Sequence, residues 1–172
     1  MTAKQLSRQT GLDLDSCSYA LGEFAVYELV ACLSPEARRS RVYGCTMQGR
    51  ACRRALGLNV ESFEEYAAPN IDWELYAWVC YSHRSEIIKA MDKPRSPAEI
   101  KKKARATNPW IRMSANNVRD VIRLFKKKGV VEEVWEHRRA HPLYKLTGIG
   151  EVLRQLLNRA GEPASPNQSK VN

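Results

Sequence analysis

The spacing of apolar residues in the second half of the chain changes several times, and each spacing predicts a different element. Apolar positions at helical intervals predict helices over residues 73–91, 97–106 and 115–128. Two short β-prone runs, Val130–Trp135 and Leu143–Leu146, stand on either side of a polar tip, which is typical of a β-hairpin. A further helix is expected after Thr147. The predicted order is therefore three helices, a hairpin and a last helix.

Residues with capping preferences mark the ends of the predicted helices. Ser96 is followed by Pro97 and, three residues after the serine, by Glu99, which is the pattern of a capping box. Ser114 precedes the next helix and Gly129 follows it. The boundaries of these two helices are thus predicted without any appeal to hydrophobic spacing.

The chain matches itself when it is shifted by 101 positions, without a gap from Ser16 to Gly57. The identical pairs are Phe24 and Phe125, Val30 and Val131, Arg38 and Arg139, Tyr43 and Tyr144, Thr46 and Thr147, Gly49 and Gly150, Arg53 and Arg154, and Leu56 and Leu157. Tyr43 and Tyr144 would pack the return strand of a hairpin, and Thr46 and Thr147 would cap the helix that follows. The match predicts two copies of one structural unit.

This arrangement resembles the winged helix-turn-helix regulators of the prokaryotic, archaeal-like MarR and ArsR type. The second copy carries the resemblance in SPAEI, in SANNVRDVIRLFKKKGVV and in RRAHPLYKLTGIGEVL. The first copy carries it in TAKQLSRQTGL, DLDSCSYALGEFAVYELV and SPEARRSRVYGCTMQGRACRRAL. The resemblance implies a mainly α fold with small β-hairpins (α+β), built from two winged helix-turn-helix units in tandem.

The expected domain organisation follows from these matches and from composition. We expect a first winged-helix unit over residues 1–57, lacking the usual first helix, an acidic linker over 58–72, a second winged-helix unit over 73–160 and a disordered tail over 161–172. Helices from residues 58–91, or another subunit, would have to replace the first helix that the first copy lacks.

Positive charge is concentrated in one part of the chain. The net charge is +9, and the 33 residues from 96 to 128 hold ten basic and two acidic side chains. A focused basic surface indicates a polyanionic partner rather than any particular fold.

The resemblance turns this basic surface into a DNA-binding prediction, because a helix-turn-helix places its second helix in the major groove. Asn pairs well with adenine and Arg with guanine, so Asn116, Asn117, Arg119 and Arg123 are expected to read bases. The preceding helix, the end of the second helix and the two wings would contact phosphates. The expected DNA-binding residues are Lys101, Lys102, Lys103, Arg105, Asn116, Asn117, Arg119, Arg123, Lys126, Lys127, Arg138, Arg139, Arg38, Arg39 and Arg41. The expected function is sequence-specific or semi-specific binding of double-stranded DNA, in a transcription regulator.

The corresponding helix of the first copy does not fit a polyphosphate. It presents Asp13, Asp15 and Glu23 and no basic residue. This keeps a second interpretation open, a tandem winged-helix protein–protein interaction module in a chromosome or replication assembly. A homodimer or a protein partner bound through residues 1–57 stays open for the same reason. Binding of structured RNA or of a replication origin would also use the basic surface.

No sequence motif indicates catalysis. Phosphate-binding loops, metalloprotease motifs and nucleophile elbows are absent, so no enzyme activity, cofactor or metal site is expected. No apolar run reaches the roughly 18 residues of a membrane helix, and the N-terminus does not have the pattern of a secretory signal. We expect a cytoplasmic, nucleoid-associated protein. The cysteines are expected to be reduced, small core residues: Cys17, Cys32, Cys45, Cys52 and Cys80.

Overall fold

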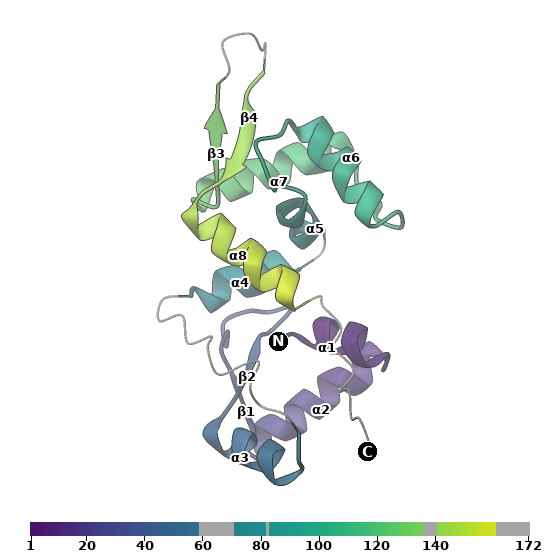
Figure 1. Ribbon diagram of the computed structural model, residues 1–172, viewed down its shortest axis with the longest axis vertical. Coiled ribbons are helices and arrows are strands. Elements are labelled where there is room, and N and C mark those ends of the chain that lie inside the picture. The colour runs from purple at the N-terminus through teal and green to yellow at the C-terminus, as the bar shows by residue number, and fades with distance from the viewer. Residues whose placement is uncertain (59–70, 82, 136–140, 161–172) are drawn as a thin grey trace, which may run out of the picture. The chain divides into compact units, whose positions relative to one another are not determined.

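The computed structural model describes residues 1–58, 71–81, 83–135 and 141–160. The chain divides into two compact units (Figure 1). Unit 1 comprises residues 1–78 together with the chain from residue 160 onward, and unit 2 comprises Val79–Arg159. The expected linker over 58–72 and tail over 161–172 fall almost entirely outside the described residues. None of the helices in the described part of the chain is long and apolar enough to span a membrane.

Unit 2 contains helices and one β-hairpin in the order that the sequence predicts. Its elements are α5 (Arg84–Lys89), α6 (Pro97–Thr107), α7 (Ala115–Lys127), β3 (Val131–Val134), β4 (Leu143–Leu146) and α8 (Gly148–Arg159). The two strands are antiparallel, with Val131 opposite Leu146 and Val134 opposite Leu143. Arg95 adds a third, bridge-like pairing, because its backbone exchanges two hydrogen bonds with Tyr144, at 2.9 and 3.0 Å.

The predicted helix starts in unit 2 are confirmed. Ser96 accepts a hydrogen bond from the backbone of Glu99, and the Glu99 side chain accepts one from the backbone of Ser96, so the capping box forms. Ser114 caps α7. Gly129 ends α7 with φ of 67°, a backbone conformation that favours glycine.

The core of unit 2 is formed by the apolar faces of its helices against the hairpin. Helix α7 buries one face, consisting of Val118, Val121, Ile122 and Phe125. Helix α8 buries Leu153 and Leu157 and packs against α5, which buries Ile87 and Ile88. The opposite face of α7 is therefore exposed to solvent. The buried face of the helix is fixed in place by its packing against the core.

Unit 1 repeats the order of helices and hairpin found in unit 2, beginning with its first helix. Its elements are α1 (Ala3–Thr10), α2 (Leu14–Val26), β1 (Val30–Cys32), β2 (Tyr43–Cys45), α3 (Met47–Ala55) and the greater part of α4 (Trp73–Cys80). Val30 pairs with Cys45, and Cys32 pairs with Tyr43. The structure is thus mixed α+β with two small antiparallel hairpins, as the sequence predicts.

Individual hydrogen bonds also recur 101 residues apart. Thr46 Oγ1 accepts from Gly49 N at 3.0 Å, and Thr46 N donates to the carbonyl of Leu29 at 3.1 Å. Thr147 makes the same bonds to Gly150, at 3.3 Å, and to Val130, at 3.1 Å. The threonine in each copy therefore ties the start of a helix to the start of the hairpin.

The structure differs from the expected helix over residues 73–91. Two helices, α4 and α5, occupy this stretch. Leu75, Tyr76 and Ala77 are buried within α4, whereas Ile87 and Ile88 are buried within α5. The two apolar runs belong to different units, and helical spacing alone does not show a change of packing partner.

The prediction that the cysteines are core residues holds for only some of them. Cys17 and Cys80 are buried, but Cys45 and Cys52 are exposed. Cys52 takes the position that the buried Leu153 has in the other copy.

Candidate nucleic-acid interface

The outer face of α7 gathers several of the predicted base-reading side chains. Asn116, Arg119 and Arg123 are all exposed, on the side opposite the buried Val118 and Ile122. The burial of one face and the polarity of the other follow directly from the sequence of α7, which alternates apolar and polar residues at helical spacing. The helix therefore presents amide and guanidinium groups on one exposed surface.

Both guanidinium groups are held by a neighbour one helical turn earlier. Arg119 Nη1 donates to Asn116 Oδ1 at 3.1 Å. Arg123 Nη1 donates to Asp120 Oδ1 at 3.2 Å and forms an ion pair with it. These contacts join solvent-exposed groups and contribute little to stability. A ligand that offers a better hydrogen-bond acceptor can therefore replace them.

Asn117 is placed differently from the other predicted base-reading residues. Ser114 Oγ donates to Asn117 Oδ1 at 2.7 Å, and Asn117 N donates to Ser114 Oγ at 3.0 Å. The amide oxygen of Asn117 therefore takes part in the N-terminal cap of α7. Asn117 thus has a structural task in addition to any contact with a ligand.

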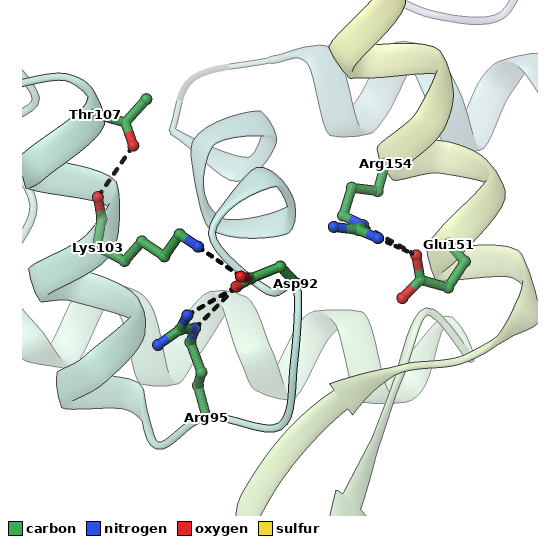
Figure 2. Close-up of polar contacts among 6 residues, drawn as sticks. All are labelled: Asp92, Arg95, Lys103, Thr107, Glu151 and Arg154. Carbon is green, nitrogen blue, oxygen red and sulfur yellow. Dashed lines mark hydrogen bonds and ion pairs between the residues drawn. The ribbon is translucent and has the colours of Figure 1, made fainter.

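Lys103 on α6 is engaged in an ion-pair cluster with Asp92 (Figure 2). Its Nζ donates to Asp92 Oδ2 at 2.7 Å, while Arg95 donates to the other carboxylate oxygen from Nη2 at 2.8 Å and from Nε at 3.1 Å. Hydrogen bonds from Lys103 and then Arg95 hold the pKa of Asp92 well below its usual value. The cluster joins α6 to the segment that pairs with Tyr144.

We expect the Asp92 cluster to stabilise unit 2 at neutral pH and to lose its effect in acid. A carboxylate with a lowered pKa contributes its stability above its ordinary pKa of 3.8, and that contribution disappears as the pH falls below this value toward the folded-state pKa. The thermal midpoint of Asp92→Asn should therefore lie below that of the wild type at pH 7, with the difference shrinking at acid pH. A difference that is independent of pH would show that charge on Asp92 is not the cause.

Some of the remaining basic residues of α6 and α7 make contacts within unit 2 although they are exposed. Arg105 Nη2 donates to the carbonyl of Met113 at 3.1 Å and so fastens the turn between the two helices. Lys126 forms an ion pair of 2.8 Å with Glu133 on β3. Lys102 and Lys127 are exposed, and Lys101 is half-buried. Lys102 and Lys127 therefore present charge to solvent, beside the exposed Arg105 and Lys126.

Two exposed residues beside α7 were not among the predicted site residues. Trp110, in the turn between α6 and α7, is 92% exposed. Arg112 is also exposed, two residues before the Ser114 cap. The sequence does indicate a turn here, because Pro109 breaks the helical pattern. A turn pattern does not show that the side chains within it take part in binding.

The structure describes the arginines of the first wing but not those of the second. Arg138 and Arg139 lie outside the described residues. In unit 1, Arg38, Arg39 and Arg41 are exposed, and Arg41 Nε donates to the carbonyl of Ala37 at 3.1 Å. These three arginines belong to unit 1, whereas α7 belongs to unit 2.

The helix of unit 1 that corresponds to α7 presents a different surface. Asp13 caps α2 by accepting from Ser16, and the hydrogen bonds from Ser16 lower the pKa of Asp13. The exposed positions beyond the cap include Asp15, Tyr19 and Glu23. The outer face of α2 is therefore acidic and partly apolar, as the sequence predicts, and lacks the groups that bind phosphate.

The described residues contain no group of three or more His, Cys, Asp or Glu side chains arranged to hold a metal ion.

The order of helices and hairpin defines unit 2 as a winged helix-turn-helix fold, with α6 and α7 as the helix-turn-helix and β3–β4 as the base of the wing. No family model matches the chain, and no curated protein is significantly similar to it. Among solved structures, the chain is similar to the crystal structure of SSV1 F-93, with 24% sequence identity and a TM-score of 0.36, over 44% of this chain and 82% of that one. The class is thus defined by the elements and contacts of the chain itself.

Proposed function

We propose that the protein binds double-stranded DNA and acts as a transcription regulator of the MarR and ArsR type. The observation that carries the proposal is the outer face of α7, where Asn116, Arg119 and Arg123 project from a helix that is capped at its start and buried along its back. In a helix-turn-helix this helix enters the major groove, and these side-chain types match the base edges found there. No catalytic step is part of the proposal.

Contacts to phosphate would supply most of the affinity. Lys102, Arg112 and Lys127 are exposed around α7 and on the preceding helix. Each phosphate neutralised releases condensed counterions, so binding weakens steeply as salt rises. Arg105 and Lys126 contribute to the same positive field while serving structural contacts.

The test is the salt dependence of binding to duplex DNA, combined with selection of bound sequences from a random duplex pool. If about six phosphates are neutralised, affinity should fall on the order of a thousandfold between 50 and 200 mM salt. Recovery of a preferred site would establish specificity. A protein that ignores duplex DNA at low salt, or that prefers structured RNA in competition, would overturn the proposal.

A second function is favoured by a separate observation in unit 1. The outer face of α2 carries Asp15 and Glu23 beside the exposed Tyr19 and Val26. This surface suits a protein better than DNA, as in tandem winged-helix modules of chromosome or replication assemblies. If this is the main function, deletion of the α7 charges would leave partner binding unchanged.

The exposed Trp110 offers a direct optical readout of the proposed interface. Its indole lies in the turn that leads into α7, so DNA seated on α7 should change its environment. We expect duplex DNA to change the tryptophan fluorescence. Trp110→Phe should remove most of that change. Trp135→Phe, which replaces another exposed tryptophan, is the comparison variant. A signal that is unaffected by Trp110→Phe would place the bound DNA elsewhere.

A further inference from the structure

The helix-turn-helix of unit 2 is longer than the corresponding part of unit 1. Thr2 and Ser96 begin equivalent helices, because each forms a capping box and each follows a residue whose backbone exchanges two hydrogen bonds with the return strand of the hairpin. In unit 1 the next helix cap, Asp13, follows Thr2 by 11 residues. In unit 2 the equivalent cap, Ser114, follows Ser96 by 18 residues. Unit 2 therefore has seven additional residues between the two caps.

These additional residues are not required to form a helix-turn-helix. Unit 1 joins α1 to α2 through residues 11–13, and Gly11 has a φ of 75°, which allows a tight turn. The connection in unit 2, Asn108–Ser114, is longer, although α6 and α7 pack against each other as α1 and α2 do. The longer connection therefore needs a reason other than joining the two helices.

The longer connection is an ordered turn that is held at both of its ends. Asn108 N donates to the carbonyl of Ala104 at 2.9 Å, and Ile111 N donates to the carbonyl of Asn108 at 3.1 Å. Met113 is buried, and its carbonyl accepts a hydrogen bond from Arg105 Nη2 at 3.1 Å. A side chain carried by such a turn loses less conformational entropy when it binds a ligand, because the backbone beneath it is already fixed.

Trp110 lies in the middle of this turn with its side chain in solvent. At 92% it is more exposed than any other large apolar residue in the part of the chain that the structure describes. An aromatic side chain of this size can bury about 150–250 Å² of surface in a contact. Arg112, two residues later, is also exposed. The turn thus presents an aromatic ring and a positive charge to solvent.

The turn precedes the end of α7 that a helix-turn-helix brings to the bases. Trp110 is four residues before the α7 cap, Ser114, so their Cα atoms are at most about 14 Å apart. The major groove of B-DNA is about 12 Å wide. With α7 seated in this groove, Trp110 is within reach of the base pairs beside those that Asn116 and Arg119 face.

The major groove offers an indole one apolar group. The edges of the bases there carry hydrogen-bond donors and acceptors, and thymine adds its C5-methyl group. Contact between an indole and this methyl group removes apolar surface of both from water, which is favourable. A phosphate beside the groove suits the guanidinium of Arg112 instead.

We propose that Trp110 contacts the C5-methyl group of a thymine at the edge of the site that α7 reads, while Arg112 binds a neighbouring phosphate. The inference rests on the proposed function, because it requires duplex DNA on α7. It adds a specificity-determining residue outside α7, so that the inserted turn extends base recognition beyond the helix.

Replacement of thymine by uracil, which lacks only the methyl group, tests the inference. The probe is a labelled duplex of the site recovered from the random pool, compared with duplexes that carry deoxyuridine at one thymine at a time. We expect one substitution at the edge of the site to weaken binding by the wild-type protein about fourfold, as for the loss of one buried methyl group.

The protein variants identify the side chain that makes the contact. Trp110→Ala should bind the thymine and uracil duplexes equally, whereas Trp110→Phe retains an aromatic ring and should keep most of the discrimination. Arg112→Ala should weaken binding of both duplexes by the same factor and reduce the salt dependence. Ile149→Ala, at an exposed apolar position of α8, is the matched control and should discriminate as the wild type does.

Failure of the proposed function and failure of this inference give different results. A chain that does not bind duplex DNA contradicts both. A chain that selects a site, but for which no edge thymine matters or Trp110→Ala still distinguishes thymine from uracil, contradicts only the contact by Trp110. Tighter binding of single-stranded DNA than of duplex, lost in Trp110→Ala, would show that the indole stacks on unpaired bases and would also overturn the inference.

Discussion

Replacement of both Arg119 and Arg123 by alanine is expected to lower the affinity for a preferred DNA site on the order of a hundredfold or more. Each arginine that makes two bonds to a guanine discriminates by about 1–3 kcal/mol, so the loss of two such contacts is large. Both side chains are exposed and, among the residues that the structure describes, are bonded within α7 alone, so their removal should leave the fold intact. Titration of a labelled duplex with the variant measures the effect.

The matched control removes the same charge from another helix of unit 2. Arg154→Ala with Arg159→Ala also lowers the net charge by two, but on α8, where Arg154 is paired with Glu151 (Figure 2). We expect this variant to lose only the general electrostatic attraction, a few-fold at moderate salt. Equal losses in the two double variants would contradict base contacts by α7 and leave only non-specific attraction.

Gly150→Ala is expected to destabilise unit 2 by about 3 kcal/mol. A Cβ at this position would lie 2.3 Å from the carbonyl oxygen of Val130, which already accepts hydrogen bonds from the backbone and side chain of Thr147. The backbone cannot yield without breaking the tie between α8 and the hairpin. Denaturant unfolding followed by circular dichroism gives the change in the free energy of unfolding.

Gly148→Ala is the control for the loss at Gly150. A Cβ at Gly148 meets no atom within 4 Å, and alanine is the better helix former. We expect this variant to be unchanged or more stable by up to about 1 kcal/mol. If Gly150→Ala were as stable as Gly148→Ala, α8 would not approach β3 as closely as the structure has it.

Much of the local structure was predictable because its causes are local. Ser96, Ser114 and Thr147 specify helix starts through bonds that span three residues, so their sequence pattern is sufficient. The strands were predictable because two β-prone runs flank a polar tip, and β4 occupies the expected residues Leu143–Leu146. The shift of 101 residues then extended these assignments to the first copy.

The contacts that the individual basic residues make within the protein were not predictable. Lys103 and Arg105 follow each other closely in a basic run, yet one is bonded to Asp92 and the other to the carbonyl of Met113. Lys126 and Lys127 are adjacent, but only Lys126 reaches Glu133. Such assignments depend on which residues of other elements lie nearby, and composition cannot supply that information.

The placement of the cysteines has a practical consequence for labelling. The exposed thiols, Cys45 and Cys52, both belong to unit 1, whereas the one cysteine of unit 2, Cys80, is buried. A maleimide dye added to the native protein would therefore attach to one half of the molecule without mutagenesis. Fluorophores attached in this way would report on unit 1 while unit 2 binds a ligand.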